Sequence, residues 1–98
     1  MCVKGRNVES PGEDPLVCGS YGSAYTQGLQ DVGGDPKYRQ ATVTLKHWVA
    51  YSVESYKGTT RHNFDAKVSP YDLSTSFFPA WEQTVKEGGA KGVMCSCE

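Results

Sequence analysis

A helix followed by a strand decides the fold, in residues 69–97, which read SPYDLSTSFFPAWEQTVKEGGAKGVMCSC. Ser69 can accept from a free backbone N–H as the N-cap, and Pro70 suits the first helical position because its missing N–H would be unpaired there anyway. Glycines 88 and 89 should end this helix. Its apolar face is predicted to consist of Leu73, Phe77, Trp81, Thr84 and Val85.

Two short strands are predicted beside this helix. Residues 92–97 are largely apolar, which is typical of a strand that is buried on both faces. Residues 41–45, ATVTL, are rich in β-branched side chains and predict an earlier strand that ends at Lys46 and His47. Residues 48–67 show no clear period, so we expect a long ordered loop there.

An earlier helix should follow residues 5–15, a segment rich in Gly, Pro and acidic residues that we expect to be a loop. Asp14 is the predicted N-cap and Pro15 the first helical residue. Apolar residues then recur at steps of three and four, although glycines at positions 19, 22 and 28 weaken the helix. The stripe predicted to be buried consists of Val17, Tyr21, Ala24, Tyr25 and Leu29.

The order of these elements is loop, helix, strand, long loop, helix, strand, which indicates an α/β fold with connections long enough for parallel crossovers. Ninety-eight residues allow at most one small domain. Two strands alone cannot make a parallel sheet that is covered on both faces. We therefore expect the chain to be part of a larger unit.

Composition excludes several classes of partner. Ten basic and eleven acidic residues give a net charge of -1, so we expect no binding to nucleic acid or to anionic lipid. No run approaches the roughly 18 apolar residues of a membrane-spanning helix, and the first residues lack the apolar core of a secretory signal. No phosphate-binding loop or Gly-x-Ser-x-Gly motif is present, and no cofactor is predicted.

The four cysteines fit neither a disulfide framework nor a metal site. Cys95 and Cys97 are only two residues apart, which is poor geometry for a mutual bridge in an extended segment. Cys2, Cys18 and the two histidines supply no second closely spaced pair for zinc. Free thiols are the prediction, and no metal ligands are assigned.

Lys46 and His47 are the most suggestive candidates for a binding site. The C-terminal ends of strands face the ligand in barrels and in doubly wound sheets. Lysine offers three donors and histidine one or two, which suits sugar hydroxyls or a carboxylate. The alternative is a surface lysine beside a buried, hydrogen-bonded histidine.

A second candidate cluster places Arg6 among the carboxylates of Glu9, Glu13 and Asp14. The guanidinium could form a fork-shaped ion pair or donate to a polar ligand. The alternative is a group of solvated loop charges.

A third cluster, on the long loop, consists of Arg61, His62, Asn63 and Asp65. Asp65 is a candidate nucleophile or general acid. The alternative is a loop aspartate that caps the backbone or pairs with Arg61.

Four motifs follow one another along nearly the whole chain. They are the Gly-Arg run of residues 5–15, Leu45-Lys46-His47, Arg61-x-x-Phe64-Asp65-Ala66-Lys67-Val68-Ser69, and Val93-Met94-Cys95-Ser96. Together they resemble the N-terminal barrel domain of glycoside hydrolase family 3, and the Pro-Gly-Glu-Asp-Pro and Phe-Asp-Ala-Lys-Val runs resemble its β-xylosidase branch. The resemblance implies that residues 1–98 are a piece of a (β/α)8 barrel, about two β/α units with a long loop.

The resemblance also implies a function. The parent would be a retaining exo-glycosidase that acts on β-linked xylo-oligosaccharides in xylan and arabinan breakdown, with its two catalytic carboxylates outside this chain. Arg6, Lys46 and His47 match family residues that bind sugar hydroxyls. Asp65 is then expected to support the loop with Arg61 rather than to act as the nucleophile. Intact relatives are mostly secreted, so an extracellular location is expected for the parent.

Departures from the family pattern lie at both ends of the chain. Cys97 and Glu98 stand where the family has Tyr-Asn, and Val3-Lys4 replaces its Trp. Three alternatives stay open: a noncatalytic carbohydrate-binding remnant, a β-glucosidase-type parent, and a small redox or metal protein using Cys95 and Cys97.

Overall fold

A computed structural model describes residues 7–31, 33 and 37–96. A 3-10 turn, η1 (Asn7–Glu9), precedes the long helix α1 (Pro15–Gln30). The strand β1 (Thr44–Trp48) follows, then a small hairpin of β2 (Ser55–Tyr56) and β3 (Thr59–Thr60). A continuous helical stretch comes next, made of α2 (Pro70–Asp72), the π-helical η2 (Leu73–Phe77) and α3 (Phe78–Lys86), and β4 (Gly92–Cys95) ends the order.

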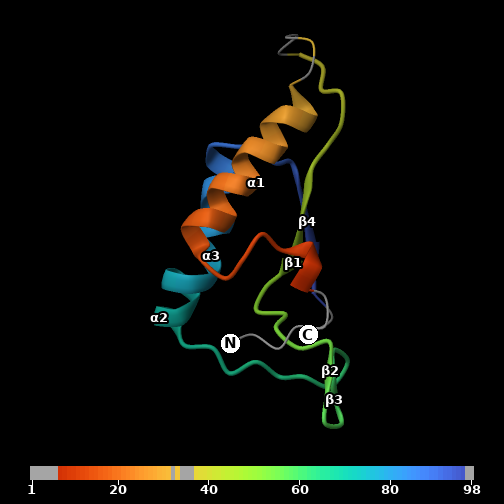
Figure 1. The fold of residues 1–98 in the computed structure, drawn as a ribbon, viewed down its shortest axis with the longest axis vertical. Coiled ribbons are helices and arrows are strands. Elements are labelled where there is room, and N and C mark those ends of the chain that lie inside the picture. The colour runs from red at the N-terminus through yellow and green to blue at the C-terminus, as the bar shows by residue number, and fades with distance from the viewer. Residues whose placement is uncertain (1–6, 32, 34–36, 97–98) are drawn as a thin grey trace.

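The two longer strands form a parallel pair beside the two longer helices (Figure 1). β1 runs beside β4 with Thr44 opposite Gly92 and Trp48 opposite Cys95, and the register shifts between Lys46 and Trp48. The predicted α/β order is therefore confirmed as a small segment with parallel strands. The described part is open: its Cα radius of gyration is 14.8 Å, against about 13 Å for a compact domain of this length.

Both helix starts are as predicted, because each depends on a cap that is local in sequence. The Asp14 carboxylate accepts from the backbone N–H groups of Leu16 at 2.7 Å and Val17 at 3.1 Å. The Ser69 hydroxyl accepts from the backbone N–H of Asp72 at 3.1 Å. Each cap satisfies donors that the first helical turn leaves unpaired.

The predicted stop at the double glycine is also confirmed. α3 ends at Lys86, and Gly89 takes a φ of +74°, a conformation that glycine adopts at little cost. The backbone N–H groups of Gly89 and Ala90 then donate back to the carbonyls of Val85 and Thr84. These bonds satisfy carbonyls at the helix end.

The predicted apolar stripe of α1 is wrong, because the helix buries its small and polar face instead. The buried positions of α1 are Gly19, Ser23, Thr26 and Gln30, and this face packs against α3. Tyr21 and Tyr25 remain about half exposed, at 56% and 54%. The physical reason is close approach: a Cβ on Gly22 would meet the Thr84 hydroxyl, so glycines that weaken the isolated helix allow the two helices to touch. The predicted stripe residues that are exposed are Val17, Tyr21, Ala24, Tyr25 and Leu29.

The strand boundaries also differ from the prediction. β1 covers Thr44–Trp48 rather than residues 41–45, because its ladder is set by β4 and not by β-branched composition. Lys46 and His47 therefore lie inside the strand and not after its end. β4 was expected to be buried on both faces, but Val93 and Met94 are about half exposed, because β1 is its partner in the described sheet. Cys97, the predicted end of that strand, lies outside the described residues.

The expected long loop is ordered and contains one hairpin. Lys57 and Gly58 form its tip, both with positive φ, which is the geometry of a two-residue turn between antiparallel strands. Beyond this hairpin, residues 49–54 and 61–69 hold neither helix nor strand. Within the described ranges, no helix has the length and apolar character that a membrane crossing requires.

Candidate functional site

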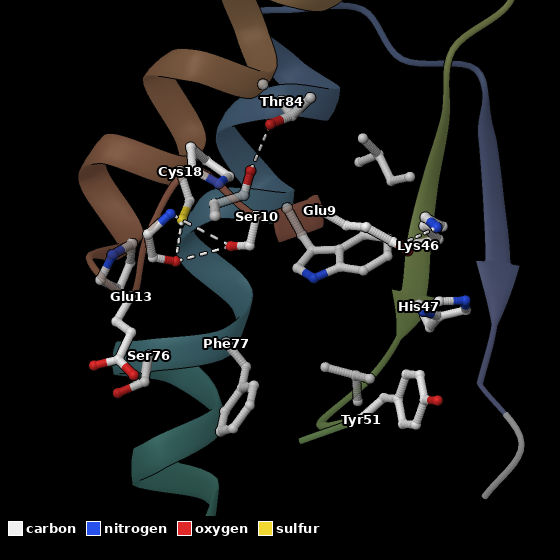
Figure 2. A pocket seen from close by; sticks show the side chains of 18 of the residues that line it. Glu9, Ser10, Glu13, Cys18, Lys46, His47, Tyr51, Ser76, Phe77 and Thr84 are labelled. Atoms are coloured by element: carbon white, nitrogen blue, oxygen red, sulfur yellow. Dashed lines mark hydrogen bonds and ion pairs between the residues drawn. The ribbon is translucent and has the colours of Figure 1, made fainter. Parts of the chain in front are cut away.

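A cavity of about 590 Å³ lies between the helices and β1 (Figure 2). Its walls come from four places in the chain: η1 with the loop after it, the first turns of α1, β1 with the residues that follow, and the helical stretch from Ser76 to Thr84. The wall is apolar at Leu45, Val49 and Phe77. An open, mixed polar and apolar hollow of this kind suits a small polar ligand that carries one apolar face.

A polar contact on the cavity wall joins Lys46 of β1 to Glu9 of η1. The Lys46 ammonium donates to the Glu9 carboxylate at 2.6 Å, and the two side chains are 40% and 33% exposed. Figure 2 shows the Glu9 side chain directed at Lys46 across the cavity. The sequence placed Glu9 with Arg6 in one cluster and Lys46 in another, and the fold joins the two clusters.

His47 lines the same cavity and packs against a buried tyrosine. Its ring meets the Tyr51 ring edge-on, with centroids 4.9 Å apart and planes at 88°. Tyr51 is only 7% exposed, so this contact limits the orientations that the His47 ring can adopt. The peptide bonds Lys46–His47 and Trp48–Val49 are both cis. Lys46 and His47 both line the cavity.

Of the other candidates in the second cluster, Glu13 lines the cavity, whereas Asp14 is occupied as the N-cap of α1. Arg6, the remaining predicted sugar ligand, lies outside the described residues.

Comparisons with known proteins bear on this geometry. No family model matches the chain. Probable β-D-xylosidase 7 of Arabidopsis thaliana is 40% identical over 97 residues, which are 94% of this chain and 13% of that protein. β-Xylosidase/α-L-arabinofuranosidase 1 of Medicago sativa subsp. varia is 42% identical over 93 residues, 94% of this chain and 12% of that protein.

A solved GH3 exo-β-xylosidase, in complex with a xylobiose aziridine activity-based probe, matches with a TM-score of 0.90 and 32% identity. The match covers 99% of this chain and 12% of that one. The chain is a β-xylosidase-like segment of glycoside hydrolase family 3. It spans about an eighth of the length of the curated relatives that it matches.

In this family 3 segment, the third predicted cluster is not part of the cavity. Arg61 pairs with Glu54 at 3.3 Å, and its backbone N–H donates to the Glu54 carbonyl at 3.0 Å across the base of the hairpin. Asp65 pairs with Lys67 instead of Arg61, so the expected Asp65–Arg61 pair is wrong. Arg61 is thus held to Glu54, the residue directly before β2.

An aromatic group beside the cavity was missed by sequence reasoning. The Trp48 ring stacks on Phe78 with centroids 5.2 Å apart, and Trp81 meets Trp48 edge-on at 5.1 Å. Trp81 also lines the cavity. Trp48 lies in a segment predicted as loop, so no period connected it with the helix that carries Phe78 and Trp81.

The thiols in the described part of the family 3 segment lie in two places, one at the cavity and one on β4. Cys18 lines the cavity and its thiol donates to the Gly12 carbonyl at 3.2 Å. Cys18 and Cys95 are free cysteines. Across residues 7–31, 33 and 37–96, no group of three or more His, Cys, Asp or Glu side chains has the arrangement of a metal site.

Proposed function

We propose that this chain supplies part of the sugar-binding wall of a family 3 β-xylosidase, with Lys46, His47 and Arg6 binding the hydroxyls of a xylose unit. The observation that carries the proposal is the position of Lys46 and His47, which line one cavity beside a carboxylate and an apolar wall. Ammonium and imidazole groups donate to hydroxyl oxygens, and the apolar wall suits the C–H face of a pyranose ring.

The barrel architecture is part of the same proposal. The chain would contribute two β/α units, with β1 and β4 as neighbouring parallel strands of a (β/α)8 barrel. Support comes from the likeness to part of a solved exo-β-xylosidase. It also comes from the exposure of Val93 and Met94 on β4, two apolar side chains that further parts of a barrel would cover.

Retaining hydrolysis needs a nucleophilic carboxylate and an acid/base carboxyl about 5 to 5.5 Å apart. The family resemblance implies that both carboxylates lie outside this chain. The proposed role of residues 1–98 is therefore to bind and orient the sugar. Donors held in place orient the ring and favour its flattening toward the oxocarbenium-like transition state.

The proposal is tested by titrating the 98-residue chain with xylose and xylobiose while following the NMR signals of His47 and Tyr51. We expect saturable binding with a Kd in the millimolar range, which corresponds to a binding free energy of about −4 kcal/mol. Lys46→Met should abolish it, and the matched control Lys86→Met, on the outer face of α3, should leave it unchanged. Unchanged binding by Lys46→Met would overturn the assignment.

A second measurement separates binding from catalysis. The same chain should release no product from a chromogenic xyloside above the rate of a Lys46→Ala control. Release well above that control would show that the chain carries its own catalytic groups, against the proposal.

A further inference from the structure

The ion pair between Glu9 and Lys46 places a hydrogen-bond acceptor and a hydrogen-bond donor side by side on the cavity wall. Glu9 comes from η1 and Lys46 from β1, and their contact at 2.6 Å spans 37 positions of the chain. Both residues line the cavity and both side chains are partly exposed, so the ion pair is accessible to a ligand.

The charges on the described cavity wall do not favour an anion. Two carboxylates, Glu9 and Glu13, and one ammonium, Lys46, line it. Because Glu9 neutralises Lys46, the described wall offers no excess positive charge to a negatively charged sugar.

The chemistry of the pair matches one class of ligand. An ammonium only donates, a carboxylate only accepts, and a hydroxyl does both. Of two adjacent hydroxyls on a sugar ring, one can accept from Lys46 while the other donates to Glu9. A sugar carboxylate can accept from Lys46 but offers no donor to Glu9, and it is repelled by that group.

We propose that Glu9 determines specificity at this site: paired with Lys46, it selects neutral sugars with adjacent hydroxyls and rejects acidic sugars. This inference rests on the proposed sugar-binding function of the same cavity. It assigns the carboxylate a role in ligand choice, in addition to joining η1 to β1.

A structural role alone makes a different prediction. If Glu9 only held η1 against β1, its loss would weaken the binding of neutral and acidic sugars alike. If Glu9 discriminates, its loss must change the ratio of the two affinities, because the repulsion acts on the anion alone.

The test compares D-xylose with D-glucuronate, which carries the same ring hydroxyl arrangement and an additional carboxylate. Dissociation constants for both are measured by NMR titration with the wild type, Glu9→Gln and Glu9→Asp. Glu82→Gln, which removes the same charge from the outer face of α3, is the matched control. Circular dichroism spectra of each variant show whether the fold is retained.

We expect Glu9→Gln to shift the ratio of the two constants toward glucuronate by roughly three- to tenfold. Glu9→Asp, which keeps the charge, should retain most of the discrimination, and Glu82→Gln should retain all of it. Equal changes for the two sugars in a folded Glu9→Gln variant would overturn the inference while leaving the binding function intact. Absence of xylose binding by the wild type would instead overturn the proposed function, and this inference with it.

Discussion

Gly22 of α1 lies so close to Thr84 of α3 that a Cβ atom on Gly22 would come within 2.6 Å of the Thr84 hydroxyl oxygen. Thr84 is 3% exposed, and its hydroxyl donates to the Ala80 carbonyl at 2.7 Å, so it cannot easily move aside. The interface between the helices therefore depends on a missing side chain rather than on apolar bulk.

Gly22→Ala should lower the free energy of unfolding by about 1–3 kcal/mol, because the added methyl group overpacks the interface. Gly28→Ala is the matched control on the same helix, since its Cβ would meet nothing within 4 Å. That change should stabilise the protein by up to about 1 kcal/mol through helix propensity. Urea unfolding followed by circular dichroism measures both, and equal shifts would contradict the packing argument.

Gln30→Leu should be one of the more damaging substitutions in the chain. Gln30 is 1% exposed, donates to the Gly89 carbonyl at 3.0 Å and accepts from the Val43 backbone N–H at 3.0 Å. The change leaves both backbone groups without this partner, at a cost of about 2–4 kcal/mol. Thermal unfolding measures the loss.

Gln27→Leu provides the comparison for this experiment. Gln27 is exposed and donates to the Glu87 carbonyl at 2.9 Å, a group that water can also satisfy. Its substitution should cost less than about 1 kcal/mol. A loss as large as that of Gln30→Leu would show that burial does not decide the effect.

Asp14→Ala should destabilise α1 by about 1 kcal/mol, because two backbone N–H groups lose their acceptor. Asp14→Ser keeps an acceptor at the cap and should recover most of the loss. Helical circular dichroism at rising urea concentration distinguishes the variants. Equal behaviour of the two substitutions would mean that the negative charge at the helix start, and not the cap bond, stabilises α1.

The Glu82–Lys86 pair on α3 should make a small, pH-limited contribution. Hydrogen bonding to Lys86, and then its charge, lowers the pKa of Glu82, and the same contacts with Glu82 raise the pKa of Lys86. Stabilisation from Glu82 is lost as pH falls through its lowered folded-state pKa, and that from Lys86 is lost as pH rises through its raised value.

The difference in Tm between the wild type and Glu82→Gln should therefore be largest between roughly pH 5 and pH 10 and disappear outside that window. Because both groups are solvent-exposed, added salt should reduce it as well. A Glu82→Gln/Lys86→Met double-mutant cycle isolates the pair, and a coupling that persists at pH 2 would contradict the assignment.

Features with local causes could be predicted from the sequence. Asp14 and Ser69 cap their own first turns, and Gly89 ends α3 by its own backbone conformation. The alternation of helix and strand follows from short-range patterns in the same way.

What the tertiary structure decided involves partners that are distant in the chain. The sequence could not show that α1 buries its small and polar face. Which face is buried depends on the close contact between Gly22 of α1 and Thr84 of α3. Nor could the sequence show that β1 extends to Trp48, where Cys95 of β4 is the partner, or that Glu9 joins Lys46 across 37 positions. Caps and turns are set by neighbouring residues, whereas burial, register and ion pairing are set by whichever surface the fold brings near.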